Sequence, residues 1–389
     1  MIKKKSVKYK ALTGGEAAAE AMKQINPDVF SAYPITPQTP IIQSFAQKVA
    51  DGEVSTKFVL VESEHSAMSV VVGAAASGVR AMTATSSQGL ALMVEVLPIA
   101  SGLRLPIVMN LATRALSAPI NIHNDHQDAM LARDLGWIQI FCENNQEVYD
   151  NNFLALCLAE EMSLPIMICQ DGFITSHNTE KVEIISDNQI KKFIKKYQPK
   201  FFLLNLKKPI TIGPLALPDY YFEIKKQVNE AMLKTGEKYL FFGKELSKIT
   251  KRNYKYFEAY QIKDAKAVIV ALGSTAGTIK FVVDKMRKKN KKVGLLKINL
   301  FRPFPYQEIK EILKKVLAVG VFDRTLGFGS YAPLAGEIKH CLNAKQIFQD
   351  FSYGLGGREI DPEDIEKTFE DLLKIKKSGI ETKYLGLRK

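Results

Sequence analysis

Residues 57–85 read KFVLVESEHSAMSVVVGAAASGVRAMTAT. A short apolar run at 57–61 is followed by a stretch rich in small residues at 66–77 and by a second apolar run at 81–85. Apolar runs of this length on either side of a helix-length segment predict a strand, a helix and a second strand. Because one helix joins the two strands, we expect them to lie parallel and to be connected by a right-handed crossover.

The same alternation extends over residues 13–177, with Thr13 as the expected cap of the first helix. Further strands are predicted at 29–33, 106–112, 137–141 and 166–169, and further helices at 14–24, 40–49, 89–100 and about 147–161. This pattern is typical of a doubly wound parallel sheet. It weakens over 181–263, which we expect to be an ordered connection. It resumes from 265 with strands at 267–272, 293–298 and 318–322 and helices at 278–288, 306–313 and 334–342, so a second, smaller α/β domain is predicted.

The composition is that of a soluble globular protein. Hydrophobic residues make up 46% of the 389 residues and charged residues 24%. No apolar run reaches the roughly 20 residues that a membrane-spanning helix requires. Five lysines precede residue 11, but no apolar stretch of the kind found in signal peptides follows them. We therefore expect a cytoplasmic protein without a membrane partner.

The net charge of +13 is unevenly distributed along the chain. Residues 11–180 hold 18 acidic and 7 basic side chains, whereas the rest of the chain holds 23 acidic and 47 basic ones. The lysines of the basic part alternate with acidic and apolar residues and lack the aromatic platforms on which single-stranded nucleic acids stack. A lysine-rich solvated surface explains this pattern, and no nucleic-acid partner is expected.

Cysteine usage bears on metal binding. The chain has four cysteines, and no two of them form a C-x-x-C pair. We therefore expect no zinc site or iron–sulfur cluster to be built from this chain alone.

Polar residues follow four of the predicted strands, at the points where the strands end. They occur at 33–40 (YPITPQTP), at 62–65 (ESEH), at 85–89 (TSSQG) and at 113–114 (TR). Ligands of open parallel sheets bind outside the carboxyl ends of the strands. The sequence therefore predicts a site at this edge before any relative is considered.

Arg114 is one of only seven basic residues in the acidic region and closely follows an apolar strand. A guanidinium group in that position suits a small carboxylate, which it can bind through two parallel hydrogen bonds. Pairing with a nearby acid, Asp125 or Asp128, is an equally good explanation. The residues alone leave both possibilities open.

Glu64 and the loop 34–37 also have two interpretations each. Glu64 either caps the helix that follows it or hydrogen-bonds a heterocycle nitrogen, and spacing alone does not separate it from Glu62. The two prolines of the loop, Pro34 and Pro37, either make a rigid connection or preorganise a loop that presents Thr36 to a ligand.

A nicotinamide dehydrogenase is a competing interpretation, because GSTAG at 273–277 joins a predicted strand to a predicted helix. The stretch is not G-x-G-x-x-G, and the next strand ends without the acidic residue that would bind a ribose. A tight turn between strand and helix explains the five residues better.

Nine segments, in order along nearly the whole chain, resemble the α subunit of 2-oxoacid:ferredoxin oxidoreductases. They are YPITP (33–37), ESEHSA (62–67), TATSSQG (83–89), TRALSAP (113–119), NDHQD (124–128), DGFITSH (171–177), FRPFP (301–305), VFDR (321–324) and GLGGR (354–358). The resemblance is greatest to the pyruvate branch, because the 2-oxoglutarate branch typically differs after the arginine.

The resemblance implies a thiamine diphosphate enzyme that oxidatively decarboxylates pyruvate to acetyl-CoA and CO₂ and reduces ferredoxin. It implies that Glu64 is catalytic and binds the cofactor's pyrimidine nitrogen, that Thr36 and Arg114 bind the substrate carboxylate, and that Pro34 lines the cofactor. The loop 86–89 is a weaker candidate for packing near the pyrimidine.

The resemblance also implies a division of labour among subunits. The chain lacks the Gly-Asp-Gly motif that anchors Mg²⁺ and the diphosphate, as well as cluster cysteines. A β subunit would supply the diphosphate site, Mg²⁺ and an iron–sulfur cluster, and ferredoxin-like γ and δ subunits would complete the electron path. The expected units are a pyrimidine-binding domain with a trailing connection at 1–245 and a transketolase C-terminal-like domain at 262–389.

Two alternatives stay open within this framework. The same chemistry could act on a branched-chain 2-oxoacid such as 2-oxoisovalerate, or on oxalate, because the sequence does not define the size of the pocket. A non-catalytic assembly subunit is the alternative of another class.

Overall fold

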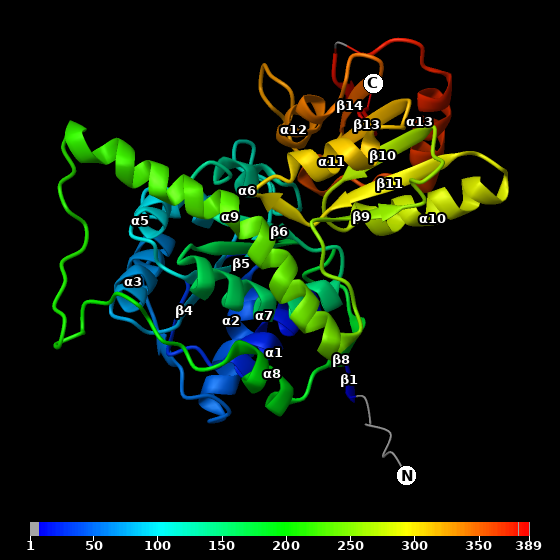
Figure 1. Ribbon diagram of the computed structural model, residues 1–389. Coiled ribbons are helices and arrows are strands. Elements are labelled where there is room, and N and C mark those ends of the chain that lie inside the picture. The colour runs from blue at the N-terminus through cyan, green and yellow to red at the C-terminus, as the bar shows by residue number, and fades with distance from the viewer. Residues whose placement is uncertain (1–7, 380, 389) are drawn as a thin grey trace.

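The computed structural model describes residues 8–379 and 381–388, which form two main sheets (Figure 1). The first sheet has seven strands in the order β12-β6-β7-β5-β4-β2-β3. All neighbouring strands are parallel except β12, which runs antiparallel to β6. The strands are β2 (Val29–Ser31), β3 (Lys57–Val59), β4 (Ala81–Thr85), β5 (Ile107–Thr113), β6 (Ile138–Phe141), β7 (Ile166–Asp171) and β12 (Leu300–Arg302).

Helices cover both faces of this sheet, which confirms the predicted doubly wound architecture. One apolar core lies beneath α1 (Gly14–Ile25), α2 (Thr39–Ala50) and α7 (Asn145–Met162). The core of the other face lies beneath α3 (Glu64–Ala76), α4 (Ser87–Met93), α5 (Leu97–Gly102) and α6 (Gln127–Leu131). Thr13 caps α1 as predicted, because its hydroxyl accepts the Glu16 N–H at 3.2 Å while the Glu16 carboxylate accepts the Thr13 N–H at 2.8 Å.

Two local predictions were wrong. The single helix expected at 89–100 is two helices, α4 and α5, and Pro98 lies in the first turn of α5. Proline is tolerated in the first turn of a helix but not in its interior, so the helix is interrupted before Pro98 and a new one begins at Leu97. The strand expected to be buried at 57–61 is the edge strand β3, which ends at Val59, and Leu60 beyond it is 81% exposed.

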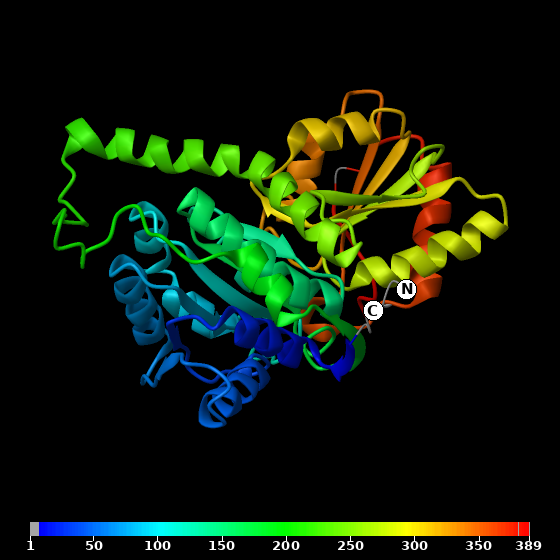
Figure 2. The same cartoon turned by 60° about the horizontal axis from the view of Figure 1, so that its bottom comes forward.

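The segment 181–263 contains more regular structure than expected. A small antiparallel sheet pairs β8 (Glu180–Ile184) with β1 (Lys8–Leu12), and α8 (Asp187–Ile194) follows. The 33-residue helix α9 (Pro218–Thr250) comes next, and its first turns project beyond the rest of the fold (Figure 2). The buried stripe of α9 has helical spacing but includes Thr235, Gly243 and Thr250. These residues do not give the apolar periodicity by which helices are recognised.

The second sheet confirms the predicted second α/β unit. Its six strands have the order β15-β14-β13-β10-β11-β9, and only β9 is antiparallel to its neighbour. The strands are β9 (Phe257–Tyr260), β10 (Ala267–Ala271), β11 (Val293–Ile298), β13 (Ala318–Asp323), β14 (Ile347–Ser352) and β15 (Lys383–Tyr384). The helices are α10 (Thr275–Lys288), α11 (Tyr306–Leu313), α12 (Pro333–Cys341) and α13 (Pro362–Lys374).

The two sheets are closely joined. The strand β12 leaves the second unit to pair with β6 of the first sheet. One continuous apolar core includes Leu97 beneath the first sheet and Leu296 and Leu334 of the second unit. The domain boundaries expected from the sequence, 1–245 and 262–389, remain a prediction, because the two units share one apolar core. Within the described ranges, no helix is long and apolar enough to span a membrane.

Candidate active site at the carboxyl edge of the first sheet

The four polar segments predicted from the sequence meet at one edge of the first sheet. They follow β3, β2, β4 and β5, which are consecutive neighbours and run parallel to one another. The carboxyl ends of these strands therefore lie side by side, and so do the segments that leave them.

Glu64 is the first residue of α3, and Ser63 caps that helix by accepting the Ser66 N–H at 3.2 Å. The Glu64 side chain is buried, with 8% exposure, whereas Glu62 is exposed and accepts a hydrogen bond from the Ser66 hydroxyl. The structure therefore separates the two acids that spacing could not. Burial raises the pKa of Glu64, and its own backbone N–H is the one hydrogen-bond donor acting on the carboxylate among the described residues.

The carboxylate of Glu64 lies against Gly89, and the segment 86–89, expected to be a loop, is Ser86 followed by the first turn of α4. A Cβ atom on Gly89 would stand 2.6 Å from Oε1 of Glu64 and 2.5 Å from Oγ1 of Thr85, so any larger residue would displace one of them. Within the described ranges, Oγ1 of Thr85 and Oγ of Ser86 are buried without a hydrogen-bond partner. Buried polar groups normally have partners. An acid that no other described residue binds, two unpaired hydroxyls and a space kept open by glycine fit a site for a polar heterocycle.

Arg114 follows β5, and the residue as a whole is 6% exposed. It donates from Nε to the Asn121 carbonyl and from Nη1 to the Thr36 carbonyl, both at 2.9 Å. Its desolvation lowers the pKa of Arg114. The alternative of pairing with Asp125 or Asp128 is not realised, because no carboxylate in the described part of the chain forms an ion pair with the guanidinium. A buried cation held by carbonyls retains donors for an anionic ligand.

The loop 33–37 brings Thr36 to Arg114 through the Thr36 carbonyl, while the Thr36 side chain and Pro34 are exposed. Pro37 is buried against Gly172, where a Cβ would stand 2.7 Å from Cγ of Pro37 and 2.3 Å from the Thr113 carbonyl. Sequence reasoning missed Gly172, although its place directly after β7 in the segment DGFITSH was a possible signal. The loop is therefore held between β7 and the Arg114 guanidinium.

Asp128 was considered from the sequence only as a possible ion-pair partner of Arg114. The structure gives it a different place, because it is fully buried on α6 and accepts hydrogen bonds from backbone N–H groups of Ser87, Arg114 and Ala129. Asp128 thus connects Ser87, at the start of α4, to the backbone of Arg114.

The turn 273–277, which suggested a nicotinamide site, holds a carboxylate of the same chain. Asp171 accepts from the Ser274 N–H at 3.0 Å and from the Ser274 hydroxyl at 2.6 Å. Gly273, at φ +65°, leaves space for the carboxylate, because a Cβ there would stand 2.6 Å from Oδ1 of Asp171. Dinucleotide folds place the pyrophosphate at such a helix N-terminus. Here Asp171, which also contacts His126 at 2.8 Å, occupies that position.

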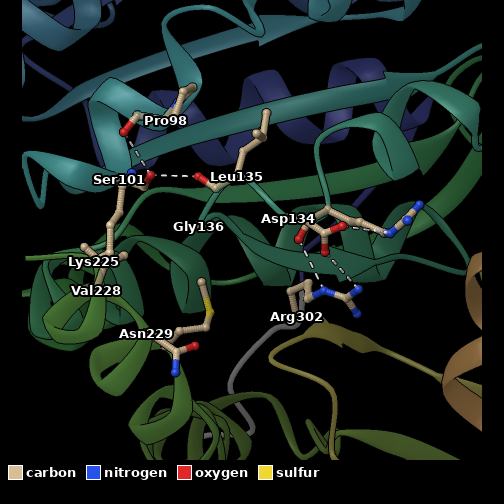
Figure 3. Close-up of a pocket in the computed structure, with 11 residues that line it drawn as sticks. Pro98, Ser101, Asp134, Leu135, Gly136, Lys225, Val228, Asn229 and Arg302 are labelled. Carbon is tan, nitrogen blue, oxygen red and sulfur yellow. Dashed lines mark hydrogen bonds and ion pairs between the residues drawn. The ribbon is translucent and has the colours of Figure 1, made fainter. Parts of the chain in front are cut away.

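A pocket of about 450 Å³ lies between α5, α9 and the loop 133–136, away from the residues predicted for the site (Figure 3). Its polar groups contact one another: Ser101 donates to the Leu135 carbonyl at 2.7 Å, and Nη2 of Arg302 lies 3.5 Å from Oδ1 of Asp134. Thr36, Glu64 and Arg114 are not among its lining residues.

Comparison with protein families gives two matches in order along the chain. Residues 20–239 match the family described as pyruvate flavodoxin/ferredoxin oxidoreductase, thiamine diphosphate-binding. Residues 265–365 match the pyruvate:ferredoxin oxidoreductase core domain II. The predicted thiamine diphosphate cofactor agrees with the description of the first family.

Curated relatives match over nearly full length. The pyruvate synthase subunit PorA of Thermotoga maritima is 53% identical, covering 97% of this chain and 98% of its own length. PorA of Methanocaldococcus jannaschii is 46% identical with the same coverage. The ketoisovalerate oxidoreductase subunit VorA of Pyrococcus horikoshii is 41% identical and covers 95% of both chains.

Solved structures agree in fold. The 2-oxoglutarate:ferredoxin oxidoreductase of Magnetococcus marinus aligns with a TM-score of 0.72 at 20% identity, over 95% of this chain and 66% of the other. A split-gene transketolase aligns with a TM-score of 0.55 at 12% identity, over 93% of this chain and 99% of the other. The two structures agree with the fold, and the family and sequence matches show that this chain belongs to the pyruvate:ferredoxin oxidoreductase family.

Proposed function

We propose that the chain is the α subunit of a pyruvate:ferredoxin oxidoreductase, which converts pyruvate and coenzyme A to acetyl-CoA and CO₂ and reduces ferredoxin. The observation that carries the proposal is the buried Glu64 carboxylate against Gly89, which no other described residue binds, on the same sheet edge as the buried Arg114. The nearly full-length similarity to pyruvate synthase subunits supports pyruvate as the substrate.

Glu64 is the proposed catalytic residue. When bound, thiamine diphosphate supplies the nucleophilic carbon and the electron sink that decarboxylation of a 2-oxoacid needs. Because burial raises the pKa of Glu64, its carboxyl group keeps a proton to higher pH than an exposed glutamate does. Glu64 can then hold or share a proton at the pyrimidine nitrogen, a role that contributes about 10²–10⁴-fold to many enzymes.

Arg114 and Thr36 are the proposed substrate-binding residues. The Asn121 and Thr36 carbonyls fix the orientation of the guanidinium through Nε and Nη1. Nη2 is then left to donate to the substrate carboxylate, beside the exposed Thr36 side chain. Pro34, exposed on the same stiff loop, is proposed to line the cofactor.

A partner subunit is proposed to cover this edge. Large apolar side chains around it are exposed, among them Leu60 after β3 (81%), Ile120 next to Asn121 (79%) and Phe328 across from Ser117 (80%). Apolar side chains gathered around a site mark an interaction surface. We assign it to a β subunit that carries the diphosphate site, Mg²⁺ and an iron–sulfur cluster, with γ and δ subunits passing electrons to ferredoxin in the cytoplasm.

The similarity to the VorA subunit keeps 2-oxoisovalerate as a second candidate substrate. No contact in the structure favours oxalate. A non-catalytic subunit is disfavoured, because it would have no use for a buried acid that no other described residue binds, on the same sheet edge as a buried arginine that no described carboxylate pairs.

The proposal is tested by anaerobic viologen reduction with the native complex purified through this chain. Pyruvate, 2-oxoisovalerate and 2-oxoglutarate are compared, each with and without coenzyme A. Reduction by pyruvate that requires coenzyme A is expected. Reduction by 2-oxoisovalerate alone would change the substrate and keep the chemistry, and no reduction by an intact, cofactor-loaded complex would refute the proposal.

The substitution Gly89→Ala is expected to lower turnover at least about tenfold, because a displacement of catalytic groups by about 1 Å has large effects on rate. The new methyl group would stand 2.6 Å from the Glu64 carboxylate and push it away from the cofactor. Turnover per assembled complex is the measurement.

The matched control is Gly73→Ala on α3, where a Cβ meets nothing within 4 Å. It should leave turnover unchanged and stabilise α3 by up to about 1 kcal/mol. Unaltered turnover of the Gly89→Ala complex would show that the glycine does not hold the place of Glu64.

A further inference from the structure

The proposed function depends on Glu64 and Arg114, which lie on different segments of the chain. The structure must therefore contain contacts that fix the distance between these two side chains. Glu64 lies on α3 after β3, whereas Arg114 follows β5, with β2 and β4 between these strands. In a reaction that joins a cofactor to a substrate, the two groups must be held in register to a fraction of an ångström.

Asp128 contacts both the start of α4 and the segment after β5. Its Oδ2 accepts the N–H of Ser87 at 2.8 Å and the N–H of Arg114 at 3.0 Å. Its Oδ1 accepts the N–H of Ala129 at 2.7 Å, which fixes the carboxylate on its own helix, α6. One buried oxygen thus joins the first residue of α4 to the segment after β5.

The first turn of α4 connects Ser87 to the surroundings of Glu64. Ser87 has φ +46°, a left-handed conformation that non-glycine residues rarely adopt and that the surrounding contacts must hold. Two residues later, Gly89 lies against the Glu64 carboxylate. A shift of Ser87 would therefore displace Gly89, which the Glu64 carboxylate contacts.

Two other hydrogen bonds join the first turn of α4 to the segment after β5. The Ser87 hydroxyl donates to the Ala115 carbonyl at 2.5 Å, and the Ser117 N–H donates to Oε1 of Gln88 at 2.9 Å. Asp128 differs from these contacts because it adds a third element, α6, and because it binds Arg114 itself.

We propose that Asp128 is a positioning residue that sets the distance between the cofactor-activating Glu64 and the substrate-binding Arg114. The inference rests on the proposed function. Asp128 touches neither ligand, and it acts through the backbone of Ser87 and Arg114. Its carboxylate accepts three N–H groups, whereas an asparagine in its place would keep the bridge from Ser87 to Arg114 through one oxygen and lose the bond to Ala129.

The test compares Asp128→Ala and Asp128→Asn in the purified complex. Asp128→Ala is expected to lower kcat 10- to 100-fold per cofactor-loaded complex, while the Kd for thiamine diphosphate and the KM for pyruvate change less than about threefold. Asp128→Asn is expected to restore most of the lost kcat. In the Arg114→Ala background, the effect of Asp128→Ala on kcat should be smaller than in the wild-type background, because only the displacement of Glu64 then remains.

The matched control is Asp323→Ala. Asp323 is likewise fully buried and accepts two backbone N–H groups, those of Leu334 and Ala335 at the start of α12. Both alanine variants should lower the melting temperature, but only Asp128→Ala should lower kcat.

Three results would overturn the proposal: equal losses of kcat in the two alanine variants, no loss in Asp128→Ala, or no rescue by asparagine. An inactive wild-type complex would instead refute the proposed function, and the two failures are therefore distinguishable.

Discussion

Replacing Glu64 with glutamine is expected to lower turnover by at least about 10²-fold, within the range that a positioned acid–base group contributes. Glutamine has nearly the same shape and fills the same space against Gly89, so the subunits should still assemble and bind thiamine diphosphate. It cannot hold or release the proton, because an amide does not titrate. The measurement is kcat with pyruvate, taken together with the thiamine diphosphate content of the complex.

The control for this substitution is Glu62→Gln. Glu62 lies two residues away on the same connection but is exposed, and its partner is the Ser66 hydroxyl at the start of α3. Its loss should change kcat less than about twofold, since exposed polar interactions contribute little. Turnover near that of the wild type in the Glu64→Gln complex would remove Glu64 from the chemistry.

The second large effect is expected for Arg114→Ala. A hydrogen bond to a charged group contributes about 1.5–3 kcal/mol, which corresponds to a rise of about 10- to 150-fold in the KM for pyruvate. Arg114→Lys should recover only part of this loss. The planar guanidinium can donate to the Asn121 carbonyl, the Thr36 carbonyl and the substrate carboxylate at the same time, whereas an ammonium group lacks this geometry. Initial rates over a range of pyruvate concentrations provide the test.

Arg104→Ala controls for the loss of an arginine whose guanidinium is held by two main-chain carbonyls. Arg104 donates from Nε to the Ser163 carbonyl at 2.9 Å and from Nη2 to the Met162 carbonyl at 2.6 Å, as Arg114 does to two other carbonyls. It precedes β5, whereas Arg114 follows that strand. Removing Arg104 should lower stability without changing the KM for pyruvate. The same KM in the Arg114→Ala complex as in the wild type would place the substrate carboxylate elsewhere.

The architecture was predictable because the apolar runs and small-residue helices of a parallel sheet are local signals. The long helix α9 was missed, since its buried stripe uses Thr235, Gly243 and Thr250, whose burial depends on what packs against them. The break between α4 and α5 was missed although Pro98 was visible, because the apolar periodicity continues across it.

The site was predictable in its location but not in its contacts. Glu64 could not be told from Glu62, because the choice depends on β3 ending at Val59 and on Ser63 beginning the next helix. The partners of the Arg114 guanidinium are the main-chain carbonyls of Asn121 and Thr36, which no side-chain pattern reveals. The contacts of Asp128 depend on how α6 packs against the start of α4 and against the segment after β5. From the sequence, Asp128 was a member of the segment NDHQD and a possible ion-pair partner of Arg114, and neither observation predicts these contacts.

The strand β12 and the shared core have a consequence for how substrate reaches this edge. Domains move relative to one another when the surface between them is small and polar. Here the second unit contributes a strand to the first sheet and apolar side chains to its interior, so it cannot swing away as a lid without breaking both. A hinge motion of the second unit therefore does not open this edge, and in the proposed complex the entry and exit of substrate would depend on movement of the subunit that covers it.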